Sequence, residues 1–566
     1  MHRGSAAPSI SSCPVRLLSA ALLPLLVVLL WSMGAPGAWA APANSSQPLA
    51  QVPPMGWNDW AHYQCDFTEQ AILENAKLLV TTGFAAHGYN TVTIDDCWMA
   101  KSRDAQGNLQ ADSERFPRGM KPVADAIHGM GLKFGIYEDA GHETCGEFAG
   151  SGGRKGGGGD HFLEDARLFA SWGVDYLKLD GCNVYVPAGI DTVAAYRKAY
   201  AAESAALKSV GRPIVFSESA PAYFQNSPEW YDVLIWVRHY GQLWREGSDM
   251  ANYHAKSADA PRFQSVLWNY AYNLPLGRFQ KPGNWNDPDF IIGGDSGMSP
   301  GETRSQMALW SMMSAPLILS SDLSKLSPEA LEILGNRAVI AVDQDPLGRM
   351  ATLLRRSAAV DILFKPLAGG DYAVAVLNRG DAPVEVQVHP AELGFAASPA
   401  CSLDAQNLWS GERQSSLSNL QEQVASHDTV IWRIDAASPC GLPTRTGAIV
   451  MTFDQAHGLM DGYTGCLAAS GRVEDCTGTA AEEWTITARG ALKSEEGCLA
   501  VANGKPVFEA CDAGTEQRWN YTLAGNLVNA RDKQCLSNGA ANGTGQTLSM
   551  QPCGHNQPNQ IWSLPN

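Results

Sequence analysis

Carboxylic acids stand directly after several short apolar runs in the first part of the chain, where they could share one pocket. In Lys178-Leu179-Asp180, the residues at i and i+2 of a strand point to the same face, so Lys178 and Asp180 would project together. An ammonium group keeps a neighbouring carboxylate ionised, as a nucleophile requires, although a strand-end salt bridge would look the same in the sequence. Two carboxylates across a pocket are the minimum for cleaving a glycosidic bond with retention of configuration. The candidates for such a pair are Asp95, Asp96, Asp139, Asp180, Glu218, Asp249, Asp287 and Asp289.

The elements that must position these carboxylates alternate between strand-like runs and helix-like stretches over residues 51–347. A repeated strand–helix pattern of this length is typical of one catalytic (β/α)8 TIM barrel, with a doubly wound open sheet as the alternative. The carboxylates favour the barrel, because barrels assemble active sites at the carboxyl ends of their strands. Strands are predicted at residues 91–94, 132–137, 174–179, 213–216, 233–237 and 316–319.

Residues 348–440 lose the helix-like stretches. They contain alternating β-type segments instead, at residues 372–377 and 384–388. This pattern predicts an antiparallel β-sandwich domain after the barrel.

The last part of the chain, residues 443–566, repeats one unit three times. The units begin with Gly465-Cys466-Leu467-Ala468, Gly497-Cys498-Leu499-Ala500 and Gln534-Cys535-Leu536-Ser537, and they close on Trp484, Trp519 and Trp562. Three equivalent units predict three structural pieces around one core, and the segment resembles the ricin-B-type β-trefoil carbohydrate-binding module. Sugar-binding repeats usually carry Asp two residues after the first Cys, where this chain has Ala468, Ala500 and Ser537. Polysaccharide binding by the trefoil and a purely structural role therefore both stay open.

The composition limits the partners and the compartment. Lys and Arg number 41 against 58 Asp and Glu, a net charge of -17, which disfavours nucleic acid as a partner. Residues 1–40 predict a cleavable signal peptide, with an apolar stretch at 17–30 and the cleavage pattern Ala38-Trp39-Ala40; an uncleaved membrane anchor is the alternative. Removing this segment takes one of 13 cysteines, Cys13, and leaves 12, an even number that suits disulfides in a secreted or periplasmic protein. The sequence has no CxxC pair or HExxH motif, so we expect no metal and no cofactor.

Six motifs follow one another in order: PMGWNDW at 54–60, IDDCW at 94–98, GLKFGIY at 131–137, YLKLDGC at 176–182, WNDPD at 285–289 and DQDPLG at 343–348. Together they resemble glycoside hydrolase family 27, the α-galactosidase and α-N-acetylgalactosaminidase family, over residues 51–436. The resemblance implies a barrel followed by an antiparallel β domain, with Asp180 as nucleophile and Asp249 as acid/base. Asp249 must be protonated to release the leaving group and ionised to activate water.

The resemblance also implies a sugar pocket. Asp95 and Asp96 would accept hydrogen bonds from the sugar 4- and 6-hydroxyls, Lys178 would bind neighbouring hydroxyls, and Trp60 would form an apolar wall at C6. Asp96 argues against arabinopyranosidase activity, because those relatives carry the longer Glu at this position. The other positions implied for the pocket are Tyr137, Cys145, Tyr223, Arg245 and Asp289.

The same resemblance pairs Cys65 with Cys97 and Cys145 with Cys182. The trefoil repeats imply the internal pairs Cys466–Cys476, Cys498–Cys511 and Cys535–Cys553, which leaves Cys401 with Cys440 by elimination.

The loop at residues 217–223 bears on the sugar substituent at C2. Relatives that act on galactose carry Glu and Leu at two reading positions, and those that act on N-acetylgalactosamine carry Ser and Ala. An ungapped alignment places Ser219 and Ala222 there, a smaller pair that leaves room for an N-acetyl group. A shifted loop could instead bring Glu218 inward to bind a 2-hydroxyl, which would restore galactose preference.

The leading interpretation is an exo-acting retaining α-galactosidase whose partner is a carbohydrate substrate. An α-N-acetylgalactosaminidase is the first alternative. A carbohydrate-binding protein with an inactive barrel is the second, although the presence of Asp180, Asp249 and the Asp95-Asp96 pair argues against it. The oligomeric state is not predicted.

Overall fold

The computed structural model describes residues 48–154, 159–225, 227–251, 262–436, 439–451, 465–539 and 547–565. Pro48–Asn566 forms one compact unit. The predicted signal peptide lies outside the described residues. Within the described ranges, no helix is long and apolar enough to cross a membrane.

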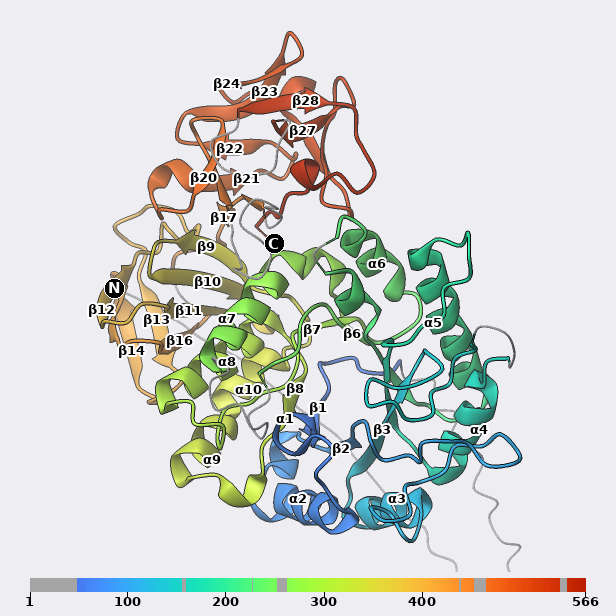
Figure 1. The fold of residues 1–566 in the computed structure, drawn as a ribbon. Helices are drawn as coiled ribbons and strands as arrows, with labels where there is room; N and C mark the ends of the chain where they lie inside the picture. The colour runs from blue at the N-terminus through green and yellow to red at the C-terminus, as the bar shows by residue number, and fades with distance from the viewer. Residues whose placement is uncertain are drawn as a thin grey trace, which may run out of the picture. The chain divides into compact units, whose positions relative to one another are not determined.

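Eight parallel strands form the barrel, in the spatial order β7-β6-β5-β4-β3-β2-β1-β8 (Figure 1). A further parallel bridge between Ile291, just after β7, and Leu319 of β8 joins the two ends of this order. The strands are almost wholly buried because helices cover the outside. Their bounds are β1 (Met55–Asn58), β2 (Thr91–Ile94), β3 (Lys133–Asp139), β4 (Tyr176–Asp180), β5 (Val215–Glu218), β6 (Leu243–Arg245), β7 (Trp285–Asp287) and β8 (Leu317–Leu319).

The helices of the barrel begin and end with recognisable local signals. At the start of the helix at 300–313, the Ser299 side chain accepts from the Glu302 backbone N–H while the Glu302 side chain accepts from the Ser299 backbone N–H, a capping box. The helix at 162–172 ends at Gly173, whose φ of 87° suits a residue without a β-carbon. The helices are α1 (Trp60–Tyr63), α2 (Glu69–Thr81), α3 (Met120–Gly129), α4 (Phe162–Trp172), α5 (Thr192–Ser209), α6 (Trp230–Val237), α7 (Arg262–Asn273), α8 (Pro300–Met313), α9 (Pro328–Leu334) and α10 (Arg337–Asp343).

One predicted strand is wrong. Residues 233–237 belong to helix α6, and the sixth barrel strand is β6 instead. Most of α6 is apolar and buried, so its sequence has no polar face to reveal a helical period, and a short apolar run does not distinguish a buried strand from a buried helix.

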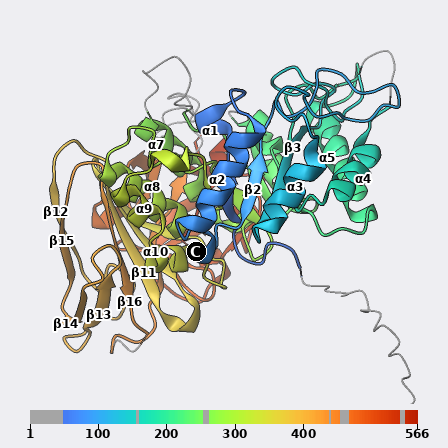
Figure 2. The ribbon, with the colours of Figure 1, turned by 90° about the horizontal axis from the view of Figure 1, so that it is seen from below.

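The sandwich consists of two antiparallel sheets (Figure 2). The larger has the order β14-β13-β16-β11-β10-β9, and β12 pairs with β15 in the smaller. Strand β11 is buried along its whole length: Val374 and Val376 join the sandwich core, whereas Ala373 and Ala375 join the cluster that contains the barrel core. The strands are β9 (Thr352–Arg356), β10 (Val360–Pro366), β11 (Tyr372–Asn378), β12 (Val384–Val388), β13 (Leu403–Asn407), β14 (Arg413–Leu417), β15 (Leu420–Val424) and β16 (Thr429–Ile434).

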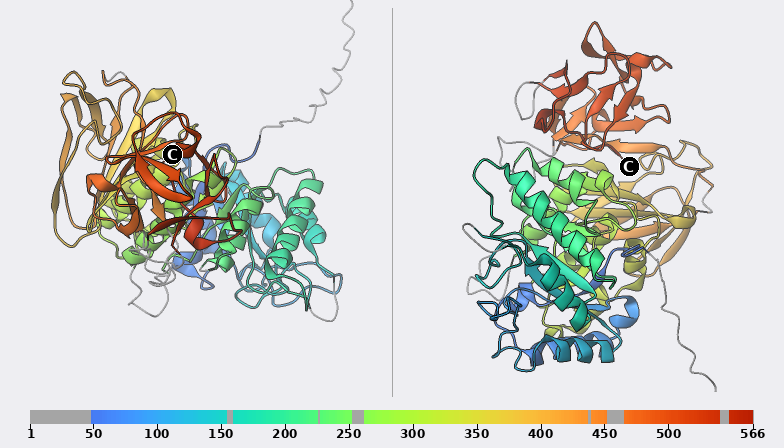
Figure 3. Two further views of the ribbon diagram at one scale, coloured as in Figure 1. Left: turned by 90° about the horizontal axis from the view of Figure 1, so that it is seen from above. Right: turned by 90° about the vertical axis from the view of Figure 1, so that its right-hand side faces the viewer.

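The threefold repeat of the sequence closes on three Trp residues that share one hydrophobic core, Trp484, Trp519 and Trp562. They belong to the C-terminal β domain, drawn in orange to red in Figure 3. The indole N–H of Trp484 donates to Leu467 O at 2.6 Å, that of Trp519 to Leu499 O at 2.8 Å and that of Trp562 to Leu536 O at 2.9 Å. Each closing Trp is therefore hydrogen-bonded to the opening strand of its own unit.

The trefoil strands in chain order are β17 (Arg445–Ala448), β18 (Val450–Met451), β19 (Gly465–Ala468), β20 (Arg472–Asp475), β21 (Glu483–Ile486), β22 (Leu492–Ser494), β23 (Gly497–Ala502), β24 (Lys505–Glu509), β25 (Trp519–Tyr521), β26 (Leu527–Asn529), β27 (Cys535–Asn538) and β28 (Leu548–Gln551). Ala468, Ala500 and Ser537, the positions that lack Asp, are all buried in these strands.

Candidate active site

Lys178 and Asp180 lie on one face of β4, but the lysine pairs with a different carboxylate. Lys178 Nζ donates to Asp95 Oδ2 at 2.7 Å, across from β4 to the end of β2. Burial alone would lower the pKa of Lys178, but the negative charges of Asp95 and Asp180 raise it above its ordinary value. Lys178 is therefore a fixed cation between two carboxylates. It is held by its ion pair with Asp95 and not by a strand-end salt bridge to Asp180.

Asp95 and Asp96 are held rigidly at the end of β2. Asn58 Nδ2 donates to Asp95 Oδ2 at 2.7 Å, and the Asp95 backbone N–H donates to Asp59 Oδ1 at 2.8 Å. The Gly146 N–H donates to Asp96 Oδ2 at 2.8 Å. Burial raises the pKa of Asp96, and the Gly146 N–H opposes the rise.

Asn58 and Asp59 belong to the site, but the residues expected from the sequence did not include them. Both lie in the PMGWNDW motif, directly after the buried apolar start of β1, so their position in the motif was the available signal.

Asp180 is the last residue of β4, and its carboxylate accepts two hydrogen bonds. The Tyr223 hydroxyl donates to Asp180 Oδ1, and the Gly181 N–H lies 3.0 Å from the same oxygen. Burial raises the pKa of Asp180, while Lys178 and the Tyr223 hydrogen bond work against that rise. A carboxylate that is half-buried, hydrogen-bonded and close to a cation is suited to nucleophilic attack.

Arg245 joins two more of the expected site residues. Its Nη2 lies 2.9 Å from Asp249 Oδ1, and its Nη1 lies 3.0 Å from Asp289 Oδ1. Asp249 keeps 67% of its side chain exposed, whereas Arg245 and Asp289 are buried. Partial desolvation by the surrounding pocket acts to raise the pKa of Asp249, but the charges of Arg245 and then Lys178 hold it below its ordinary value.

Asp289 is a structural anchor of this group. Its backbone φ of 77° is unusual for a residue with a β-carbon, and it is maintained by two hydrogen bonds: the Met250 N–H to Asp289 Oδ2 at 2.6 Å, and the Asp289 N–H to Asp287 Oδ1 at 2.9 Å. Burial raises the pKa of Asp289 to about 6, and Arg245 opposes the rise.

Aromatic rings border the same group of charges. Lys178 Nζ lies 5.1 Å from the centre of the Tyr137 ring and 5.2 Å from that of Phe290. Trp60, half-buried, opens helix α1 directly after β1. Phe290 was missed by the sequence reasoning, although it stands directly after Asp289 in the chain.

The loop after β5 corrects one expectation. In the β4–β5 register, Ser217 pairs with Lys178 and Glu218 with Leu179, so Glu218 points to the face opposite Lys178. Its carboxyl group lies against Gly241, where an added β-carbon would come 2.5 Å from Glu218 Oε1. Glu218 is therefore not brought inward to read a sugar and leaves the set of candidate carboxylates. Ser219 is buried, and its hydroxyl has no hydrogen-bond partner among the described residues.

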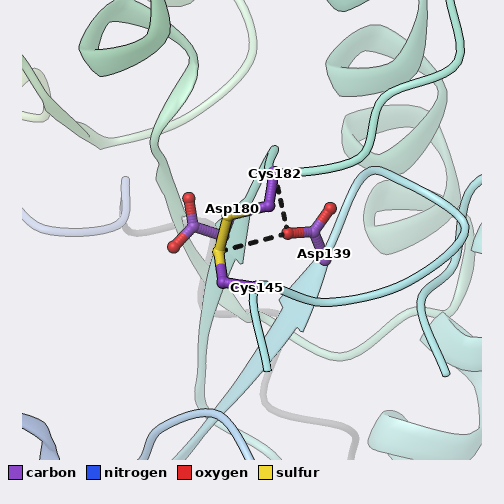
Figure 4. A group of neighbouring side chains, drawn as sticks. All are labelled: Asp139, Cys145, Asp180 and Cys182. Carbon is purple, nitrogen blue, oxygen red and sulfur yellow. Dashed lines mark hydrogen bonds between the residues drawn. A yellow bond between two sulfur atoms is a disulfide. The ribbon is translucent and has the colours of Figure 1, made fainter. Parts of the chain in front are cut away.

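Asp139, Cys145, Asp180 and Cys182 form a tight cluster, with one carboxylate oxygen or sulfur of each within 4.8 Å of the others (Figure 4). Such a set resembles a metal site, but the two sulfurs are bonded to each other as a disulfide. A disulfide offers no thiolate to a cation, so the cluster does not fit a thiolate metal site.

The described residues contain six disulfides. They join the pairs that the sequence predicts: Cys65–Cys97, Cys145–Cys182, Cys401–Cys440, Cys466–Cys476, Cys498–Cys511 and Cys535–Cys553. Cys145 and Cys182 lie exposed beside Asp180, and Tyr137 Oη lies 3.4 Å from Cys145 Sγ.

Carboxylates gathered at the carboxyl ends of barrel strands define the class of this protein as a barrel glycoside hydrolase. Residues 52–345 match the family described as Alpha galactosidase A, residues 357–434 the Alpha galactosidase C-terminal beta sandwich domain, and residues 462–562 the Ricin-type beta-trefoil lectin domain. The chain belongs to the α-galactosidase A family, within glycoside hydrolase family 27.

Individual relatives agree with this assignment. Alpha-galactosidase A of Aspergillus niger is 37% identical over 541 residues, which cover 93% of this chain and 94% of that protein. The structure of α-galactosidase I from Mortierella vinacea matches with a TM-score of 0.61 at 29% identity, covering 70% of this chain and 100% of that one. The α-galactosidase of Saccharomyces cerevisiae with raffinose matches with a TM-score of 0.60 at 25% identity, covering 68% and 98%.

Proposed function

We propose that this protein is a retaining exo-α-galactosidase, with Asp180 as nucleophile and Asp249 as acid/base. The observation that carries the proposal is the network of charges around Asp180, in which Lys178 bridges toward Asp95 and Arg245 holds Asp249. The full-length similarity to a named α-galactosidase supports the sugar assignment.

In the first step, Asp180 attacks C1 of the terminal sugar while the bond from C1 to the leaving oxygen breaks, and Asp249 gives its proton to that oxygen. In the second step, Asp249 takes a proton from water, whose oxygen attacks C1 and releases Asp180. Tyr223 keeps the Asp180 carboxylate in place through its hydrogen bond.

Recognition of the sugar rests on the rigid end of β2. Asp95 and Asp96 accept hydrogen bonds from the 4- and 6-hydroxyls, Lys178 binds adjacent hydroxyls, and Trp60 packs at C6. The backbone and side-chain donors that fix both aspartates support this role, because a preorganised acceptor pays little entropy when the sugar binds.

An α-N-acetylgalactosaminidase is the second candidate, and Ser219 is the observation that favours it. Its buried hydroxyl lacks a partner among the described residues and could bond an acetyl oxygen, with Ala222 leaving room for the methyl group. The trefoil, as a member of a lectin family, is proposed to hold polysaccharide near the barrel. The disulfides support export to an oxidising compartment.

The deciding experiment compares kcat/KM on nitrophenyl α-galactoside and nitrophenyl α-N-acetylgalactosaminide, since the ratio of these constants is the specificity. We expect the galactoside to be preferred; preference for the acetamido sugar would select the second candidate. Proton NMR of the first-formed sugar should show the α-anomer, and first formation of the β-anomer would exclude double displacement.

A further inference from the structure

Asp139, the last residue of β3, has no place in the mechanism above, yet it lies beside the proposed nucleophile. It pairs with Asp180 in the β3–β4 register and is fully buried. One carboxylate oxygen of each residue falls within the 4.8 Å cluster, and the Cys145–Cys182 disulfide belongs to the same cluster (Figure 4).

The Asp139 carboxyl group organises the turns on both sides of it. Oδ1 accepts from the Gly141 N–H at 2.6 Å, and Oδ2 accepts from the Cys182 N–H at 3.0 Å. The Cys182 N–H belongs to the peptide that follows Gly181, whose own N–H contacts Asp180 Oδ1 at 3.0 Å and Tyr223 Oη at 3.2 Å. Fixing Cys182 therefore fixes the donors around the nucleophile.

The titratable side chains around Asp139 are acidic or neutral. They come from the same strand, from neighbouring strand ends, from α5 and from the loop after β5: Asp96, Asp180, Tyr137, Tyr196, Tyr200 and Tyr223. Glu138 precedes Asp139 but points to the opposite face of β3, where burial raises its pKa well above the ordinary value. Burial, followed by the charge of Asp180, raises the pKa of Asp139 to about 8, and the N–H groups of Cys182 and Gly141 oppose that rise. Two carboxylates this close do not both ionise freely, so the pair together retains one proton near neutral pH.

We propose that Asp139 is a positioning residue for the nucleophile: it fixes the Gly181-Cys182 turn and carries the proton of the carboxyl pair while Asp180 stays ionised. This inference rests on the proposed function. Loss of that proton places a second negative charge beside Asp180, and repulsion between the two disturbs the geometry of attack.

The test uses 5-fluoro-α-galactosyl fluoride, because fluoride leaves C1 without needing a proton from Asp249. Asp180 attacks C1, the C1–F bond breaks, and the slow glycosyl-enzyme is read as a mass increase on the Asp180 peptide. For the wild type, we expect the rate constant of labelling to fall as pH rises through about 8, the pKa of Asp139.

The variant Asp139→Asn should label about tenfold more slowly near pH 6, because the amide NH2 replaces one of two acceptors and the turn loosens. Its labelling rate should then be flat through pH 8, because an amide does not titrate. The matched control is Glu138→Gln, the adjacent buried carboxyl on the other face of β3, which should lower thermal stability at most and keep the wild-type pH profile.

Three results overturn the inference. The inference is overturned if the labelling rate constant of the wild type does not fall near pH 8, and this result counts even if Asp139→Asn fails to fold. It is also overturned if a folded Asp139→Asn variant keeps both the wild-type labelling rate and the fall near pH 8. If the wild type is not labelled at Asp180 at all, the proposed function itself is wrong and the inference falls with it.

Discussion

Arg245 Nη2 lies 2.9 Å from Asp249 Oδ1, so the cation that anchors the proposed acid/base also lowers its pKa. A general acid must hold a proton when substrate binds, and kcat/KM reports the protonation of the free enzyme. The ion pair therefore favours activity on the acidic side of neutrality.

We predict that kcat/KM on nitrophenyl α-galactoside falls as pH rises from an acidic optimum, as Asp249 loses its proton. Replacing Arg245 with Met removes the cation, raises the pKa of Asp249 and should move this fall to higher pH. Profiles measured from about pH 3 to pH 8 check the shift. Arg212→Met, which breaks the ion pair to Asp175 instead, serves as control and should leave the midpoint in place. An unmoved midpoint in Arg245→Met would contradict the electrostatic role.

The loss of activity in Asp249→Asn should depend on whether the leaving group needs a proton. We expect kcat/KM to fall about a thousandfold on melibiose, whose sugar leaving group must be protonated, and much less on dinitrophenyl α-galactoside. Azide should then accelerate the variant by attacking the glycosyl-enzyme without base catalysis, giving α-galactosyl azide. Equal losses on both substrates would assign the acid role to another residue.

Ala222→Leu tests the space near C2. The added methyl groups should reduce kcat/KM on the N-acetylgalactosaminide at least about tenfold, because an overpacked pocket excludes the N-acetyl group, and should spare the galactoside. Glu218→Gln is the control: since Glu218 points to the opposite face, it should leave the ratio of the two constants unchanged. A changed ratio in Glu218→Gln would restore the idea of an inward Glu218.

Lys365 predicts a pH dependence of stability outside the active site. This fully buried residue of β10 donates to Ser311 O, Val342 O and Ser314 Oγ, and burial lowers its pKa to about 8. Between pH 8 and the ordinary lysine pKa, the unfolded chain binds a proton that the folded chain has lost, so the contribution of Lys365 to stability rises with pH.

The free energy of unfolding of the wild type should therefore gain up to about 3 kcal/mol relative to Lys365→Met as pH rises from about 7 to about 10. Urea titrations at each pH measure the difference. The difference in unfolding free energy between the wild type and a variant at the exposed Lys133, Lys133→Met, should not change with pH in this way. An equal change with pH for both variants would refute the assignment to Lys365.

The sequence by itself determined the periodic features. The i, i+2 spacing put Lys178 and Asp180 on one face, the alternation of runs predicted the barrel, and the three closing Trp residues predicted the trefoil. These follow from local geometry, which is encoded in short stretches of chain. The resemblance of six motifs extended them to a family, and the comparisons confirmed that family.

Only the tertiary structure decided which charges meet. Lys178 takes Asp95 as its partner from 83 residues away, because β2 and β4 flank β3 in parallel and end at the same edge of the barrel. Glu218 turned away from the pocket because its register with Leu179 assigns it to the other face. Residues 233–237 are predicted as a strand and form a helix, because burial on nearly all sides removes the polar period by which a helix is recognised in the sequence. The pairing of Asp139 with Asp180 likewise depends on strand register, which no local spacing fixes.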